Sequence, residues 1–201
     1  MKNNIILASN SEIRRKLLRK AGVHFKAVKS NFDETQLQNR YKNQECSLRD
    51  AKILAKKLSY EKAKIISDKG SNLLVIGCDQ ILLFDKKVLN KPNSFEESFK
   101  QMKDLSGKKH ILITATSCVK ESKEIWYYIS IQKMCMRKLS DDYIKKYIDQ
   151  IGNNVLNILG GYEIEGKGIN LFESIGDDLF SIQGIPILQL TNFLRQAEFI
   201  E

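Results

Sequence analysis

The chain has 201 residues, of which 42% are hydrophobic and 28% charged, a composition that suits a folded domain and excludes wholesale disorder. Its net charge of +9 comes from lysines spread along the whole sequence, so we expect attraction of small polyanions but no stable binding of nucleic acid. Neither an apolar run of about 18 residues nor a secretory signal is found, so no membrane span and no export are predicted. The four scattered cysteines are typical of free thiols in a cytoplasmic protein: Cys46, Cys78, Cys118 and Cys135.

Strands and helices alternate in the first half of the chain. The apolar patterns predict, in order, a strand at 5–8, a helix at 12–21, a strand at 23–28, a helix at 47–67 and a central strand at 72–77. The last of these is a continuous apolar run, the pattern of a strand that is buried on both faces.

The second half continues the alternation. It predicts a short hairpin at 81–92, a helix at 94–105 with a capping box, a long hairpin formed by 110–119 and 127–137, a helix at 140–150, a glycine-rich and then strand-like segment at 160–175, and a last helix at 186–196. Because no linker or repeat interrupts this pattern, we expect one α/β domain over residues 1–201.

Carboxylates follow two of the predicted strands. Asp79 comes directly after the apolar run that ends at Cys78, and Asp33 and Glu34 follow the strand at 23–28. Catalytic and ligand-binding groups of open α/β sheets favour the carboxyl ends of strands, although Asp79 could equally cap the turn that follows. Together these carboxylates have the chemistry to hold a hard divalent cation.

Cations and hydroxyl groups provide the complement for an anion. Ser9, Ser11 and Arg14 stand where a strand passes into a helix, so backbone N–H groups there can face a phosphate. Lys62 and Lys91 can add point charges, although a single lysine of this kind is more often a surface lysine. A phosphate loop, a nucleophile-elbow serine and a His/Cys pair are all missing. The residues therefore point to chemistry by carboxylate, metal and cation.

Eight short motifs resemble, in order, the landmarks of the Maf nucleotide pyrophosphatases: LASNSEIRRKLL, DE at 33–34, EKA at 61–63, GCDQ, NKP at 90–92, LSGKKH, GGYEIEGKG and IQGIPI. The resemblance covers the chain from Ile6 to about Leu194. It implies a fold shared with the inosine-triphosphate pyrophosphatases, with a twisted mixed sheet flanked by helices and two lobes around a cleft.

The resemblance also implies an activity, the hydrolysis of a nucleoside triphosphate to the monophosphate and pyrophosphate with Mg²⁺ or Mn²⁺. The resemblance implies that Asp79 is the general base and that Glu34 and Asp79 hold the metal. The residues expected to bind the substrate are Ser9, Ile13, Arg14, Lys62, Gln80, Lys91 and Glu165.

Three of these positions depart from the pyrimidine-type members of the family. Ile13 stands in place of an arginine, Gln80 in place of a threonine and Glu165 in place of a glutamine. The Gln/Glu pair resembles that of the members that hydrolyse 7-methyl-GTP, although their aromatic residue at the position of Ile13 is missing. Because a carboxylate only accepts hydrogen bonds, Glu165 favours the donor-rich edge of a guanine, and we expect a purine-type substrate.

Other hypotheses remain open from the sequence. A dTTP- or UTP-type pyrophosphatase of the same family and an inosine- or xanthosine-triphosphate pyrophosphatase are the enzymatic alternatives. A non-catalytic nucleotide-binding regulator of septum formation is the third. The oligomeric state is also open, with a homodimer as one alternative.

Overall fold

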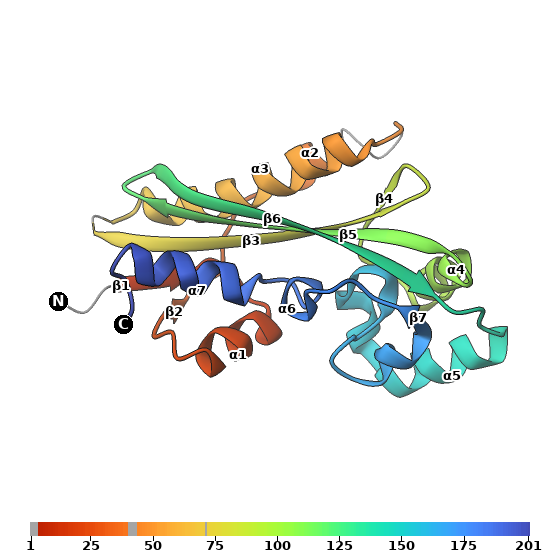
Figure 1. Ribbon diagram of the computed structural model, residues 1–201. Helices are drawn as coiled ribbons and strands as arrows, with labels where there is room; N and C mark the ends of the chain where they lie inside the picture. Colours follow the sequence, from red (N-terminus) through yellow and green to blue (C-terminus); the bar gives the residue numbers. More distant parts are fainter. Residues whose placement is uncertain (1–3, 40–43, 71) are drawn as a thin grey trace.

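A seven-stranded mixed sheet forms the centre of the molecule in a computed structural model that describes residues 4–39, 44–70 and 72–201 (Figure 1). Its strands are β1 (Asn4–Leu7), β2 (Lys26–Ala27), β3 (Leu73–Phe84), β4 (Lys87–Leu89), β5 (Lys109–Lys120), β6 (Lys123–Met136) and β7 (Phe172–Ser174). They follow the order β2-β1-β3-β5-β6-β7, and β4 also pairs with β3. The β1 strand is parallel to both its neighbours, and the other pairs are antiparallel. The predicted α/β class with a mixed sheet is confirmed.

Helices cover both faces of the sheet. They are α1 (Glu12–Lys20), α2 (Thr35–Asn39), α3 (Leu48–Ser67), α4 (Phe95–Leu105), α5 (Asp141–Ile151), α6 (Leu179–Ile182) and α7 (Ile187–Gln196), with 3₁₀ turns at Gly152–Asn157, Leu159–Gly161 and Lys167–Leu171. In Figure 1, α2 and α3 lie on one side of the sheet and α1, α5, α6 and α7 on the other. No helix among the described residues is long and apolar enough to cross a membrane.

The hydrophobic core follows this layering. The buried side of α3 packs on one face of β3 and β5, with Leu54 and Leu58 against Ile81 and Ile113. The opposite face carries two separate clusters, one with β1, α1 and α7 and the other with α4, α5 and the 3₁₀ turns. This division on one side of the sheet agrees with the two lobes expected from the sequence.

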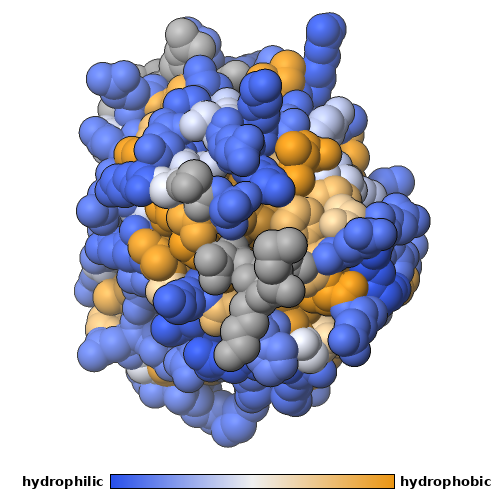
Figure 2. Space-filling view, turned by 90° about the vertical axis from the view of Figure 1, so that its left-hand side faces the viewer, coloured by the Kyte–Doolittle hydropathy of each residue, from blue (hydrophilic) through white to orange (hydrophobic). Residues whose placement is uncertain are grey.

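Polar side chains cover most of the surface at one end of the molecule. Figure 2 shows the end of the molecule where both termini lie, with hydrophilic groups around smaller apolar patches. All four cysteines are free, as predicted.

Several predicted elements need correction. The central strand does not stop at 77 but continues to Phe84, so Asp79 lies in the middle of β3 and not at a strand end. The strand predicted at 23–28 is reduced to the two residues of β2, and α6 was not predicted. The capping box at α4 is half formed, because the Glu97 carboxylate accepts from the N–H of Asn93 and not from that of Ser94. A complete box begins α3 instead, between Ser47 and Asp50.

Candidate active site

One edge of β3 is left without a strand neighbour at its centre. The β1 strand pairs with β3 only as far as Ile76, and β4 pairs with it only from Leu82. Between these two residues β3 has β5 on one side and, among the residues that the structure describes, no strand on the other. The Arg14 guanidinium covers part of this edge, since its Nη1 donates a hydrogen bond of 2.9 Å to the carbonyl of Cys78. Side chains from both faces of the sheet can therefore meet at this gap.

The side chain of Asp79 points to the α3 side of the sheet. Alternate residues of a strand share one face, and the α3 backbone passes so close to Gly77 that a Cβ there would lie 2.0 Å from the Ser59 carbonyl oxygen. Asp79 is two residues further along the strand, and Lys62 is three residues beyond Ser59 on the helix. This geometry brings the Nζ of Lys62 to 2.5 Å from the Oδ1 of Asp79. The glycine thus permits the close packing that sets the ion pair.

Lys62 joins two carboxylates. Besides Asp79 it contacts Glu34, whose Oε1 lies 2.8 Å from the same Nζ. Asp79 is almost fully buried, with 6% of its surface exposed. Burial raises the pKa of the Asp79 carboxyl, and the Lys62 cation opposes that rise. Burial alone would lower the pKa of Lys62, but Asp79 and Glu34 outweigh it and raise the pKa above its ordinary value.

Arg14, in the first turn of α1, is held by hydrogen bonds to three other segments of the chain. Ser11 caps the helix, because its hydroxyl accepts from the backbone N–H of Arg14 at 3.5 Å. The Arg14 side chain donates from Nε to the carbonyl of Gly184 at 2.8 Å and from Nη1 to the buried hydroxyl of Ser9 at 3.4 Å. Gly184 has a φ of +101°, and a Cβ there would lie 3.0 Å from the Arg14 Nε. A side chain at 184 would disturb both the turn and the arginine.

Lys91 belongs to the same charged group although it reaches the surface. Desolvation lowers its pKa, and the Arg14 and Lys62 cations lower it further, whereas the nearby carboxylates raise it. The structure therefore brings together six of the predicted residues: Ser9, Arg14, Glu34, Lys62, Asp79 and Lys91. Three cations around a buried carboxylate create a positive field that can attract a polyanion, and the carboxylate has the chemistry to accept a proton.

Gln80 points to the opposite face of the sheet from Asp79. Its Nε2 donates to the Thr114 hydroxyl at 2.9 Å and to the carbonyls of Ser181 and Ile182 at 3.2 and 3.0 Å. The predicted residue at this position thus joins the centre of β3 to α6.

Glu165 lies in the turn before the last 3₁₀ helix, Lys167–Leu171. Desolvation raises its pKa, and the Lys16 cation of α1 lowers it. Ile13 is one helical turn before Lys16 and is partly exposed. Glu165 and Lys16 thus influence each other electrostatically, and a binding site shared by Ile13 and Glu165 stays a prediction.

The residues at the gap suit a divalent cation, although no cluster of three metal-ligating side chains occurs in the described parts of the chain. The Glu34 and Asp79 carboxylates both contact the Lys62 ammonium, so their oxygens are close enough to share one cation. Mg²⁺ and Mn²⁺ prefer such oxygen ligands, and Mg²⁺ is often held by one or two carboxylates with substrate phosphates. Asp33, the third carboxylate considered from the sequence, caps α2 through the Thr35 N–H at 2.9 Å.

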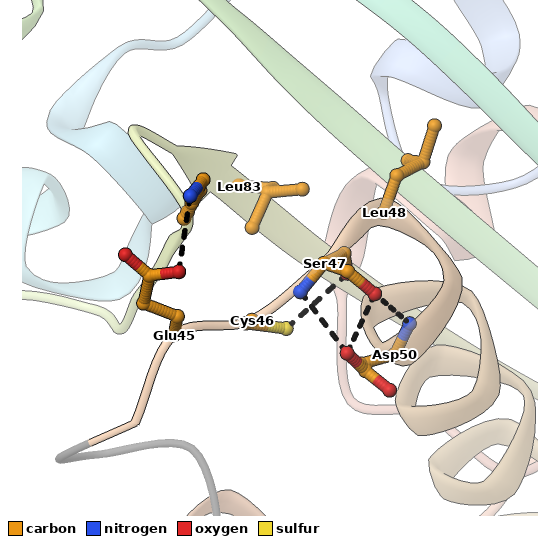
Figure 3. A pocket seen from close by; sticks show the side chains of 7 residues that line it. Glu45, Cys46, Ser47, Leu48, Asp50 and Leu83 are labelled. Atoms are coloured by element: carbon orange, nitrogen blue, oxygen red, sulfur yellow. Dashed lines mark hydrogen bonds and ion pairs between the residues drawn. The ribbon is translucent and has the colours of Figure 1, made fainter.

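A separate pocket of about 450 Å³ lies between the start of α3 and the β3–β4 hairpin (Figure 3). It is lined by Glu45, Cys46, Ser47, Leu48, Asp50, Leu83 and Lys86. No residue of the charged group around Asp79 lines it. Its polar groups mostly pair with one another, as in the capping box of α3 and the 3.0 Å contact between Lys86 and Glu45.

Sequence reasoning missed the parts played by Gly184 and Thr114. Gly184 lies within the IQGIPI motif, but a lone glycine does not say which side chain approaches it. Thr114 sits in an apolar strand pattern and carried no signal of its link to Gln80.

Comparison with known proteins places this geometry in a family. A family model described as Maf-like protein matches residues 4–197. A 7-methyl-GTP pyrophosphatase of Bartonella quintana (strain Toulouse) is 38% identical over 200 residues, which cover 100% of this chain and 98% of that protein. A nucleoside triphosphate pyrophosphatase of Ruegeria sp. (strain TM1040) is 34% identical over 201 residues and covers 100% of both chains. A 7-methyl-GTP pyrophosphatase of Bartonella henselae is 39% identical over 197 residues, or 98% of this chain and 97% of that protein.

Proposed function

The chain belongs to the Maf-like protein family, and on that premise we propose that it is a pyrophosphatase that hydrolyses a nucleoside triphosphate to the monophosphate and pyrophosphate. The relatives named above support this reaction class. The observation that carries it is the buried Asp79 held by Lys62 beside Arg14 and Lys91. Our proposal places the reaction in the cytoplasm, in keeping with four free thiols.

Asp79 is our candidate for the general base. Its Oδ1 is held by Lys62, which fixes the carboxylate and leaves the other oxygen to accept a proton. In the proposed step, water attacks the α-phosphorus as its proton passes to Asp79. The bond from the α-phosphorus to the bridging oxygen then breaks, and pyrophosphate leaves with that oxygen. Burial raises the pKa of Asp79, which strengthens it as a base.

Arg14, Lys62 and Lys91 are the proposed partners of the phosphate oxygens, with the Ser9 hydroxyl beside Arg14. A planar guanidinium can bind two oxygens at once, and the lysines act as point charges. Such groups stabilise the negative charge that moves onto the leaving pyrophosphate. Glu34 and Asp79 would hold a divalent cation, which when bound neutralises phosphate charge.

The proposed substrate is a purine-type nucleotide such as 7-methyl-GTP. Glu165 lies within electrostatic range of Lys16 on α1, on the side of the helix that also carries Ile13. A carboxylate there accepts from the N1–H and amino groups of a guanine, and it favours a base whose ring carries a positive charge. It would repel the carbonyl oxygens of uracil or thymine.

Pyrophosphate release from a panel of triphosphates tests the proposal. Purified protein with Mg²⁺ or Mn²⁺ should release pyrophosphate from 7-methyl-GTP and GTP faster than from dTTP or UTP. Faster turnover of dTTP and UTP would overturn the purine assignment and leave the reaction class intact. No turnover of any triphosphate would overturn the enzyme and favour a nucleotide-binding regulator.

A further inference from the structure

The single turn of α6 exposes two large apolar side chains next to the charged group. Leu179 and Phe180 are 45% and 43% exposed, whereas Ser181 and Ile182 are buried. The last two residues of the turn thus pack against the protein, and the first two expose a leucine and an aromatic ring to solvent. The site described above assigns no role to either side chain.

This turn is fixed from the sheet. Two carbonyls face the end of the Gln80 side chain, and because carbonyls only accept, the amide nitrogen must be the end that contacts them. Thr114 adds a second donor to the Ser181 carbonyl, at 2.8 Å. The Asp178 carboxylate caps the turn through the Ser181 N–H at 3.1 Å. So short a helix would not be stable alone, and these contacts give it one position.

Phe180 is one tight turn away from the arginine of the phosphate site. The Phe180 carbonyl accepts a hydrogen bond of 3.1 Å from the N–H of Ile185. Gly184, the residue before Ile185, accepts from Arg14 through its own carbonyl. In Figure 1, α6 lies below the sheet between the group formed by α1 and α7 and the group that contains α5. Glu165 comes from the second group and lies within electrostatic range of Lys16 of the first. The α6 turn therefore lies between the group that carries α1 and the group that carries Glu165.

We propose that Phe180 and Leu179 form an apolar platform on which the nucleobase of the substrate lies, and that Gln80 positions this platform. The inference rests on the proposed function and deepens it. With the phosphates at Arg14, an adjacent flat base needs an apolar surface and a polar group at its edge, which Phe180 and Glu165 supply. Base–aromatic stacking tolerates every base, and an alkylated base with a positive ring gains a cation–π attraction. Phe180 would thus provide the ring that Ile13 does not.

Two ligands separate the base from the phosphates. The first is guanosine monophosphate, whose dissociation constant can be measured by calorimetry without turnover. The second is inorganic tripolyphosphate, which has no base and competes at the phosphate site. Phe180→Ala should weaken guanosine monophosphate binding, and raise the KM for the triphosphate, by about tenfold. The inhibition constant of tripolyphosphate should stay within twofold of wild type. Leu188→Ala is the matched control, because Leu188 is 60% exposed on the neighbouring α7.

Each outcome shows whether Phe180 holds the nucleobase. Unchanged monophosphate binding in Phe180→Ala would overturn the platform, and so would an equal loss for monophosphate and tripolyphosphate. If the wild type hydrolyses no triphosphate, the proposed function fails, while the calorimetric comparison still decides whether Phe180 holds a base.

The part assigned to Gln80 needs a test of its own. Gln80→Met keeps the length of the side chain and removes the donors to α6. If Gln80 acts through α6, the double variant Gln80→Met/Phe180→Ala should bind the monophosphate no more than about twofold worse than Phe180→Ala alone, because the platform is already lost. Losses that simply add would show that Gln80 acts on the base independently of Phe180, and would overturn the positioning role.

Discussion

The Nε of Arg14 donates a hydrogen bond of 2.8 Å to the carbonyl of Gly184, 170 residues further along the chain. The same guanidinium reaches the carbonyl of Cys78 at the open edge of β3. One side chain thus ties α1 to the central strand and to the turn between α6 and α7. Its position depends on a backbone conformation that only glycine adopts with ease.

Gly184→Ala should therefore lower both stability and substrate affinity. At a φ of +101° a side chain is strained, which costs about 1–3 kcal/mol, and the new Cβ would lie 3.0 Å from the Arg14 Nε. We expect the KM for the nucleotide to rise about tenfold, the effect of losing one charge-assisted hydrogen bond. Gly22→Ala is the control, because Gly22 also has a positive φ but a Cβ there meets no atom within 4 Å. An equal rise of KM in both variants would separate Gly184 from the site.

Asp79→Asn should lower kcat by about 10² or more, since the amide keeps the shape of the side chain but cannot accept the proton. Thermal unfolding should show that the variant still folds. Asp33→Asn is the comparison, because Asp33 caps α2 and lies outside the charged group. Activity of Asp79→Asn within a few-fold of wild type would remove Asp79 from the mechanism.

Lys62→Met should move the acidic limb of the pH–rate profile to higher pH. Lys62 lowers the pKa of Asp79, whereas burial and Glu34 raise it. Without the cation the base stays protonated to higher pH, so activity appears later as the pH rises. Lys64→Met serves as the control, since Lys64 pairs with the exposed Asp68 on the same helix. The profile is measured as kcat/KM from pH 5 to 9. If the acidic limb of Lys62→Met lies at the same pH as in wild type, Lys62 does not modulate the pKa of the base.

Arg14→Ala should weaken the binding of tripolyphosphate, because a phosphate oxygen loses a charge-assisted partner. We expect an inhibition constant about tenfold higher than in wild type. Arg195→Ala tests for general charge effects, because Arg195 lies in the last turn of α7 and bonds to Asn192. Unchanged inhibition in Arg14→Ala would show that the phosphate site has been misplaced.

His110 should make the fold sensitive to acid. Its Nε2 lies 2.8 Å from the Tyr162 hydroxyl, and its buried Nδ1 has no partner in the described structure. Burial lowers the pKa of His110 to about 4, so between about pH 6.5 and 4 the unfolded chain takes up a proton that the native state does not. Stability is therefore lost as the pH falls through this window, by about 2 kcal/mol at pH 5.

Denaturant unfolding at pH 7.5 and pH 5 measures this loss. His110→Gln should reduce the difference between the two pH values, whatever it does to stability at pH 7.5. His24→Gln, at an exposed histidine, should leave the difference as in wild type. The opposite pattern would assign the acid sensitivity to another group.

Glu165→Gln should narrow the preference for guanine-type over pyrimidine triphosphates. An amide can donate to the carbonyl oxygens of uracil and thymine, which a carboxylate repels. The kcat/KM ratio of GTP to UTP should fall several-fold, and Glu163→Gln, two residues away, should leave it unchanged. Wild-type preference for UTP, with Glu165→Gln neutral, would refute the role of this side chain.

The sequence predicted the element order well where apolar periodicity and caps agree. The starts of α3 at Ser47 and of α5 at Ser140 follow from N-caps, and the course of α7 follows from helical spacing. A strand break was predicted after 77 because Asp79 and Gln80 are polar, and this prediction was wrong. Both are tolerated inside β3, since Lys62 neutralises one and Thr114 and the α6 carbonyls bond the other. Such long-range partners leave no trace in the local pattern.

The sequence named residues that meet around Asp79 but not how they come together, and their roles stay predictions. Nothing in the spacing shows that the gap beside β3 arises because β1 and β4 share one edge of that strand. The α6 turn was missed for a similar reason, since four residues are too few for a periodic signal.

The Arg14–Gly184 contact also determines when the site can form during synthesis of the chain. A chain made from its N-terminus produces Ser9, Arg14 and Lys62 early, yet the carbonyl that orients the arginine arrives only with residue 184. Domains generally fold as units while synthesis proceeds in that direction. A nascent chain that has not reached this residue therefore carries the side chains that we propose to bind phosphate without their final arrangement, and on this proposal nucleotide hydrolysis begins only after the late segment has docked.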